Sequence, residues 1–180
     1  MWQKYYNVTS VEEAKKLLAE YGQKARIVVG ATDLMLEIEK GVRRDIFALI
    51  DISRAPGLDR IMMDEEEIIH LGPTVTHNQC ASSKILRERA FPLVYASWQI
   101  GAPQIRNRGS IAGNLITASP ANDTISPLMA LDAKVKLVSS QGERIIPLSE
   151  FYSGVRKTVM QPDEILVDIF FPAMLSLIHI

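Results

Sequence analysis

The sequence is poor in the residues that build disulfides and metal centres. Cys80 is the single cysteine among 180 residues, so this chain by itself forms no internal disulfide and no multi-cysteine metal or iron–sulfur site. His70, His77 and His179 are not spaced as metal ligands, and we interpret each of them as structural or exposed. The sequence therefore predicts no metal site in this chain.

Strong charge and long apolar runs are absent as well. The 20 basic and 21 acidic residues leave a net charge of −1 with no basic stripe, which argues against a nucleic-acid partner. No apolar run approaches the ~20 residues that cross a bilayer, and the N-terminus shows no secretory pattern. We expect a cytoplasmic protein without a membrane span.

Catalytic side-chain patterns are also missing. No Ser-His-Asp or Cys-His arrangement and no proton-transfer pair is legible in the sequence. The composition is otherwise that of an ordinary globular domain, with 47% apolar residues to build a core. We therefore predict no catalytic residue of the chain's own.

The first 55 residues alternate between strand and helix patterns. Residues 5–10, 25–29 and 45–53 read as strands, and a helix from Val11 begins at an S-x-x-E capping box (Ser10 and Glu13) and ends at Gly22. Residues 34–41 read as a second, short helix. This β-α-β-α-β order favours a small parallel sheet with crossover helices.

The pattern changes after Ala55-Pro56-Gly57, which we take as a boundary between two lobes. Residues 60–64 and 66–72 resemble a hairpin around a short acidic turn. Helices are predicted over 74–90, 92–101 and 123–133, the last one capped by Asp123, and antiparallel strands over 134–140, 142–148 and 164–171. The predicted class is α/β (α+β): a small β-α-β lobe, residues 1–55, and a larger lobe, residues 56–174, with helices and a mainly antiparallel sheet.

Two short segments rich in small residues have the composition of backbone anion cradles. The first turn is residues 29–33, Val-Gly-Ala-Thr-Asp, and the second turn is residues 109–114, Gly-Ser-Ile-Ala-Gly-Asn. Small residues let a ligand approach the backbone, and unpaired N–H groups can point at phosphate oxygens. The first turn could equally be a plain strand-to-helix turn with a Thr or Asp cap. Neither matches a Rossmann or Walker pattern.

Other polar residues near the turns have two readings each. Asp123 could accept hydrogen bonds from ribose hydroxyls or cap a helix, and Arg106 and Arg108 could contact phosphate or lie in solvent. Trp98 falls on an apolar helical face and is interpreted as core rather than as a stacking platform.

The two turns with their flanks resemble the FAD-binding subunit of the molybdenum hydroxylases, the family of xanthine dehydrogenase and carbon monoxide dehydrogenase medium subunits. "RIVVGATDLM" resembles the family's A-G-G-T-D-L motif, and "QIRNRGSIAGN" resembles Q-I-R-N-x-A/G-T-I-G-G-N. "FYSGVRKTVMQPDEILVDIFFP" is similar to a later family segment. The similarity extends to about Pro172.

The resemblance implies two lobes with FAD between them. Val28, Val29, Gly30, Ala31, Thr32, Asp33 and Leu34 would hold the pyrophosphate from the first lobe, and Ser110, Ala112, Gly113 and Asn114 from the second. It also implies that Thr117 lies near the flavin, that Asp123 binds the adenosine ribose, and that Ile100 and Leu166 pack against the cofactor rings.

The chain departs from the family pattern at two residues and in its C-terminal part. Ala31 and Ala112 replace glycines, and an alanine that needs positive φ costs about 1 kcal/mol. The family's C-terminal domain is not expected within these residues. Residues 175–180 resemble a translated sequencing adaptor, so we expect a non-native tail.

By resemblance, the chain is a flavoprotein electron-transfer subunit. A molybdopterin-binding large subunit would oxidise the substrate, a [2Fe-2S] small subunit would pass electrons to FAD, and FAD would reduce NAD or another acceptor. The cofactor would supply the chemistry and the protein its binding and orientation. Two alternatives stay open: a stand-alone two-lobed flavin oxidase or reductase, and a scaffold subunit that has lost FAD.

Overall fold

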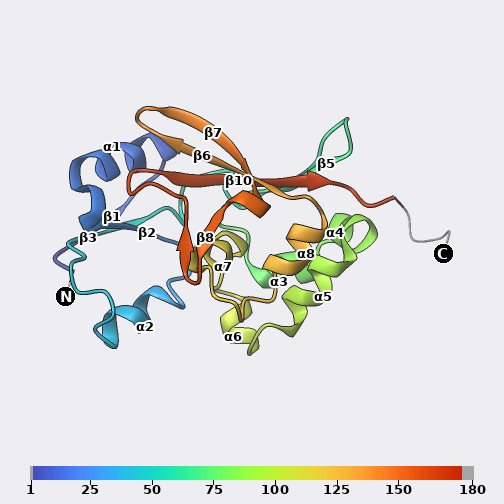
Figure 1. Cartoon of the computed structure of the whole chain (residues 1–180), viewed down its shortest axis with the longest axis horizontal. Helices are drawn as coiled ribbons and strands as arrows, with labels where there is room; N and C mark the ends of the chain where they lie inside the picture. Colours follow the sequence, from blue (N-terminus) through green and yellow to red (C-terminus); the bar gives the residue numbers. More distant parts are fainter. Residues whose placement is uncertain (1, 176–180) are drawn as a thin grey trace.

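A computed structural model describes residues 2–175, so the suspected tail lies outside the described residues except for Leu175. The first part of the chain forms a three-stranded parallel sheet in the order β1-β3-β2 (Figure 1). The strands are β1 (Lys4–Asn7), β2 (Ala25–Val28) and β3 (Ala48–Asp51). They are connected through α1 (Val11–Tyr21), the 3-10 turn η1 (Gly22–Lys24) and α2 (Leu34–Glu39). The predicted β-α-β-α-β order is confirmed.

The second sheet is antiparallel throughout and has the order β4-β5-β10-β6-β7. Its members are β4 (Ile61–Met63), β5 (Ile68–Leu71), β6 (Lys134–Ser139), β7 (Gly142–Pro147) and β10 (Ile165–Pro172). Both predicted hairpins are present, and β10 enters between them as the central strand. A 3-10 turn η2 (Leu148–Glu150) and a small hairpin of β8 (Tyr152–Gly154) and β9 (Lys157–Thr158) connect β7 to β10.

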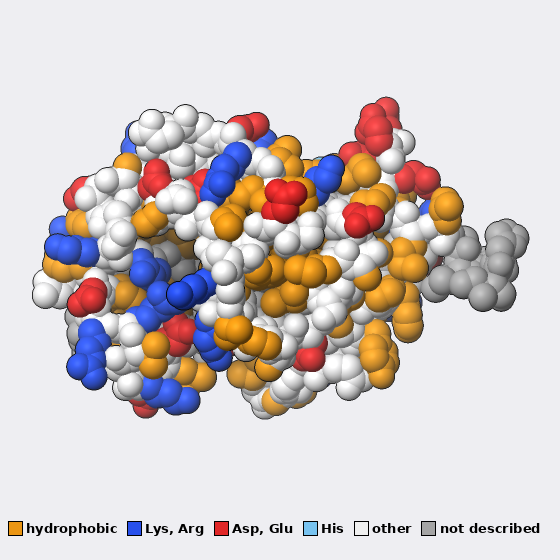
Figure 2. All heavy atoms as spheres, in the orientation of Figure 1, with side chains coloured by type: hydrophobic (Ala, Val, Ile, Leu, Met, Phe, Trp, Pro, Cys, Tyr) orange, Lys and Arg blue, Asp and Glu red, His pale blue; other side chains and the backbone are white. Residues whose placement is uncertain are grey.

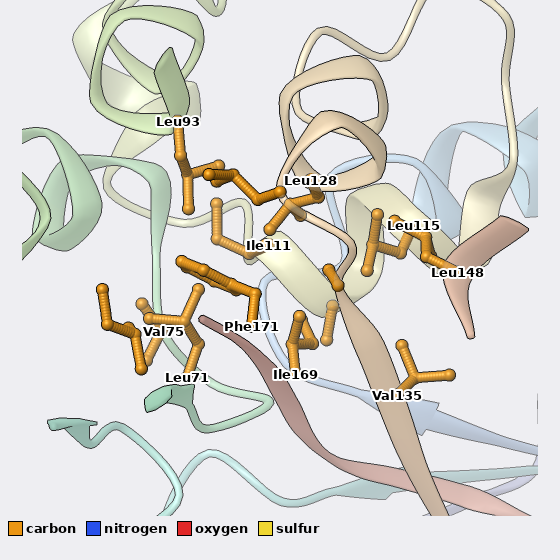
Figure 3. Packing of buried hydrophobic residues seen from close by; sticks show 14 of the residues in the cluster. Leu71, Val75, Leu93, Ile111, Leu115, Leu128, Val135, Leu148, Ile169 and Phe171 are labelled. Carbon is orange, nitrogen blue, oxygen red and sulfur yellow. The ribbon is translucent and has the colours of Figure 1, made fainter. Parts of the chain in front are cut away.

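Six helices cover one face of the antiparallel sheet (Figure 1). They are α3 (His77–Ser82), α4 (Lys84–Arg89), α5 (Phe91–Gln99), α6 (Pro103–Arg106), α7 (Ile111–Thr117) and α8 (Ile125–Ala130). Figure 3 shows Leu93, Ile111 and Leu128 of these helices pointing toward Ile169 and Phe171 of β10. Burial of this apolar face fixes the helices on the sheet.

The strand β10 takes part in both hydrophobic cores. Ile165, at its start, is buried with Val8, Leu18 and Ile50 of the parallel part, whereas Ile169 belongs to the core under the helices. A register shift between Leu166 and Asp168 marks a bulge between these two segments. The strand β10 therefore connects the two hydrophobic cores. Along the chain, the parallel sheet ends at Asp51 and the antiparallel sheet begins at Ile61.

The predicted cap of the last helix was wrong. Helix α8 begins at Ile125 with Thr124 as its N-cap, and no side chain caps its backbone. The hydroxyl of Thr124 donates instead to the Asn114 side chain, and a turn from Ser119 to Asn122 holds Asp123 one residue before the cap position. A tertiary hydrogen bond therefore took the place of the local capping preference.

Candidate functional site

A cavity of about 690 Å³ lies between the parallel sheet and parts of the antiparallel half of the chain, including the start of α3 and the elements that follow α6. Its walls come from the first turn after β2, the second turn with α7, the β8–β9 hairpin and the start of β10. Figure 2 shows this hollow with Lys and Arg side chains gathered around it. Its size is typical of sites for small molecules and cofactors.

Gly30 brings the first turn into direct contact with the second. A Cβ atom at Gly30 would lie 1.7 Å from the carbonyl oxygen of Arg108 and 3.1 Å from the backbone nitrogen of Gly109. The neighbouring atoms are backbone and cannot rotate away. Only glycine therefore allows the first turn, which follows β2, and the second turn, which lies between α6 and α7, to meet at the edge of the cavity.

The first turn carries open backbone donors and a strained alanine. Within residues 2–175, the N–H groups of Gly30, Ala31, Thr32 and Asp33 donate no hydrogen bond. Ala31 has φ 57°, in the left-handed region that costs an L-residue roughly 1–2 kcal/mol. The first turn thus offers the unpaired donors of an anion cradle, and the position at which the family motif carries glycine has positive φ in this chain.

The segment predicted as a second turn is in the structure mostly the first part of helix α7. Ser110 is the N-cap of α7, and its Oγ accepts a hydrogen bond from the Gly113 N–H at 3.0 Å. The glycine and the asparagine are tolerated inside α7 because the cap and the buried side chains of Ile111 and Leu115 stabilise it. Ala112 is an ordinary helical residue and is only 3% exposed, so it carries no strain of the kind found at Ala31.

Side chains of α7 connect the turns and fix the cavity wall. The Thr117 hydroxyl donates to the Gly113 carbonyl at 2.9 Å and lies 3.4 Å from the Asp33 carboxylate across the cavity. The Asn114 side-chain oxygen accepts from the Thr124 hydroxyl, and the Asn114 backbone carbonyl accepts from the Asn122 side-chain amide at 2.5 Å. Asn114 therefore holds the α7–α8 connection against the helix.

Three arginines around one glutamate form a charged end of the cavity that the sequence did not predict. Glu37 of α2 pairs with Arg43 at 2.5 Å and with Arg156, between β8 and β9, at 3.7 Å. Burial, and next the charge of Arg43, lowers the pKa of Arg26, which lines the same cavity. The ion pair to Arg156 crosses the cavity from one part of the molecule to the other.

The two arginines considered in the sequence have other roles. Neither is among the residues that line the cavity. Arg106 donates to the carbonyls of Ile100 and Gly101 and lies 4.9 Å from the ring centre of Trp98, which is exposed rather than core as predicted. Arg108 contributes its backbone carbonyl to the contact with Gly30.

The structure brings together thirteen of the fifteen predicted site residues. The cavity is lined by Val28, Val29, Gly30, Ala31, Thr32, Asp33, Leu34, Ser110, Ala112, Gly113, Asn114, Thr117 and Leu166. Ile100, the C-cap of α5, and Asp123, in the turn before α8, lie outside this lining. Segments that are distant in sequence therefore form one site.

The fold and the paired turns agree with comparisons to known proteins. The model of the family described as the FAD binding domain in molybdopterin dehydrogenase matches residues 2–174. The nicotinate dehydrogenase FAD-subunit of Eubacterium barkeri is 36% identical over 170 residues, which cover 92% of this chain and 56% of that protein. The carbon monoxide dehydrogenase medium chain of Hydrogenophaga pseudoflava is 32% identical over 169 residues, 94% of this chain and 58% of that one.

A solved structure supports the same relationship. The carbon monoxide dehydrogenase from Hydrogenophaga pseudoflava that lacks the Mo-pyranopterin moiety superposes with a TM-score of 0.92 at 31% identity, over 97% of this chain and 60% of that chain. The protein thus has the two-sheet fold of the FAD-binding domains found in dehydrogenases. It belongs to the family of FAD-binding domains in molybdopterin dehydrogenases, and its cofactor is FAD. The chain spans somewhat more than half the length of these relatives. In residues 2–175, no helix combines the length and hydropathy that a membrane crossing requires.

Proposed function

We propose that the chain is the FAD-binding part of an electron-transfer subunit in a molybdopterin-dependent dehydrogenase. The single observation that carries this proposal is the cavity bounded by the turn after β2 and the turn before α7, which contact each other at Gly30 and Arg108. Thirteen of the residues that line it are ones that the family resemblance assigns to the cofactor. The relatives' names, a "FAD-subunit" and a "medium chain", point to the same role.

The donor set fits a pyrophosphate. The free N–H groups of residues 30–33 form one side, the hydroxyl of Ser110 the other, and Arg43 and Arg156 place positive charge nearby. We propose that the N–H groups of Gly30–Asp33 and the hydroxyl of Ser110 bind the phosphates, that Gly113 lets the phosphates approach the backbone, and that Thr117 and Leu166 lie along the flavin. Ile100 and Asp123 would reach the cofactor only at its ends.

Bound FAD supplies the redox chemistry, because a flavin accepts and donates electrons in one- or two-electron steps. The chain's own residues bind it, orient it and shield it. We propose that electrons arrive from a [2Fe-2S] small subunit next to a molybdopterin-binding large subunit and leave to NAD or another acceptor, in the cytoplasm. The single cysteine, Cys80, is buried and isolated, so iron–sulfur clusters would lie on the partner.

Flavin titration tests the proposal. The purified protein from the complete gene should bind FAD and show visible flavin absorbance, and Gly30→Ala should abolish binding because the turns must separate. Gly154→Ala is the matched control, since its Cβ would meet only the end of the Lys157 side chain, at 4.0 Å. Failure of the unaltered protein to bind FAD would overturn the proposal and favour a scaffold without cofactor.

Reduction tests the electron-transfer part. Co-expressed with the products of neighbouring genes, the flavoprotein should be reduced by the hydroxylase substrate and reoxidised by NAD or another acceptor. Reduction by a substrate without any partner would instead favour a stand-alone flavin enzyme.

A further inference from the structure

His77 is fixed against the second turn by backbone pairing. It is the first residue of α3, and its N–H donates to the Gly109 carbonyl at 3.1 Å. On either side, Thr76 forms a bridge with Ser110, and the Ile111 N–H donates to the Val75 carbonyl at 2.9 Å. The segment before α3 and the second turn are therefore one rigid unit, and the His77 side chain lines the same cavity.

The ring of His77 is buried with one nitrogen unsatisfied. The residue is 3% exposed, and Nδ1 has no hydrogen-bond partner among residues 2–175. A buried N–H without an acceptor is rarer in proteins than an acceptor that lacks a donor. The proton is therefore assigned to Nε2, and Nδ1 is the acceptor without a donor.

The edge of the ring that carries Nε2 faces the second turn. A Cβ atom at Gly109 would lie 3.1 Å from Cδ2 and 3.4 Å from Nε2 of His77. Glycine thus keeps the space beside this edge open, next to the Ser110 hydroxyl. The oxygen of that hydroxyl already accepts from the Gly113 N–H, so its proton is free to be donated.

Burial also sets the charge of the ring. It lowers the pKa of His77 to about 4, so the imidazole is neutral at neutral pH and donates through a single N–H. The neutral His77 ring can therefore act as a fixed, uncharged hydrogen-bond donor. None of the side-chain hydrogen bonds among the described residues involves His77 Nε2, and Nε2 is not among the fully buried polar atoms, so this donor is open to the cavity.

We propose that His77 is a cofactor-positioning residue whose Nε2–H donates a hydrogen bond to a phosphate oxygen of FAD held against the second turn. The inference rests on the proposed FAD function and adds a residue from outside both family motifs. A donor to an anionic oxygen in a partly dry cavity is worth more than one between neutral groups.

Two substitutions separate this role from a structural one. His77→Phe removes the donor and also the unsatisfied Nδ1, so the protein without FAD should be as stable as the unaltered protein or more stable. Its FAD dissociation constant should rise about tenfold or more. His77→Gln retains an N–H donor and should stay within about threefold of the unaltered affinity.

Tyr152→Phe is the matched control. The Tyr152 hydroxyl is likewise buried without a partner among residues 2–175, but it does not line the cavity. Its removal should raise stability and leave FAD affinity unchanged. Phosphorus NMR of bound FAD should show shifted resonances in His77→Phe and not in Tyr152→Phe, which places the contact at the phosphates.

Two results would overturn the inference while leaving the proposed function intact. One is unaltered FAD affinity in His77→Phe; the other is an affinity loss shared equally by His77→Phe and His77→Gln without any change in the phosphorus resonances. Absence of FAD binding in the unaltered protein would refute the proposed function itself, and this inference with it.

Discussion

Restoring the two family glycines should change stability in opposite directions. Ala31 has φ 57°, so Ala31→Gly relieves roughly 1–2 kcal/mol of left-handed strain. The substitution also has two destabilising effects: glycine loses roughly 0.5–1 kcal/mol more chain entropy on folding, and removal of the half-buried methyl group costs about 0.4 kcal/mol. The expected net effect is a stabilisation of about 0.5 kcal/mol.

Ala112→Gly has no strain to relieve. Ala112 lies inside α7 and is 3% exposed, so glycine loses about 1 kcal/mol of helix propensity and about 0.8 kcal/mol of buried methyl group. The expected destabilisation is just under 2 kcal/mol. The two variants should therefore differ by about 2 kcal/mol in the free energy of unfolding.

Urea unfolding without FAD measures both values under the same conditions. For a chain of this length, 2 kcal/mol corresponds to about 4–8 °C in melting temperature, which is well resolved. A stabilising Ala112→Gly, or a destabilising Ala31→Gly of more than about 1 kcal/mol, would refute the assignment of strain to the first turn alone. FAD titration of Ala31→Gly and Ala112→Gly then shows whether FAD affinity depends on the backbone geometry at these two positions.

The remaining predictions concern three other positions. Gly30→Ala should unfold at lower urea even without FAD, by about 2 kcal/mol or more, whereas Gly154→Ala should not. Burial lowers the pKa of His70, but hydrogen bonds to Asp168 and Asp64 outweigh this and raise it; the associated stability is present below about pH 6.5 and lost as pH rises through the folded value. His70→Gln should thus destabilise more near about pH 5.5 than near about pH 8.5 in urea titrations. Burial raises the pKa of Glu164, yet Arg144 and the Gln161 N–H lower it further, so Glu164→Gln should lose about 1–2 kcal/mol at neutral pH and little once the pH falls below the folded pKa. An unchanged Glu164→Gln at neutral pH would contradict that pairing.

Local signals in the sequence were sufficient for most elements and for the two sheet types, but not for α6, α7 and the β8–β9 hairpin, nor for the division of the helix predicted over 74–90 into α3 and α4. Alternation of strand and helix patterns predicted the parallel sheet, and the acidic turn at Asp64 and the turn at Ser139–Gly142 predicted both hairpins. The insertion of β10 between those hairpins was not predictable. It depends on which apolar faces meet in the folded chain, and strand propensity holds no information about pairing between distant segments.

In the candidate site, too, some residues were predictable from local sequence signals and others depend on contacts between distant segments. The two turns are visible as runs of small residues, so thirteen residues could be assigned to one cavity through the resemblance. His77 and the arginines at positions 26, 43 and 156 carry no local signal. In a sequence, a single histidine or arginine in a cavity cannot be distinguished from one on the solvent-exposed surface. The backbone pairing with Gly109 distinguishes His77, the ion pairs with Glu37 distinguish Arg43 and Arg156, and the cavity lining distinguishes Arg26.

The width of the cavity is set by β10 as well as by the turns. Ile165 anchors the start of this strand in the core of the parallel part, and Ile169 anchors its middle beneath the helices. Between them Leu166 lines the cavity, and the bulge before Asp168 shifts the register on β6. Because one strand is held in both cores, the two turns cannot drift apart without exposing apolar surface from either core. The two sides of the cavity are therefore held together at two places, by β10 and by the contact between Gly30 and Arg108. The open N–H groups of the first turn are consequently held in place before any ligand binds.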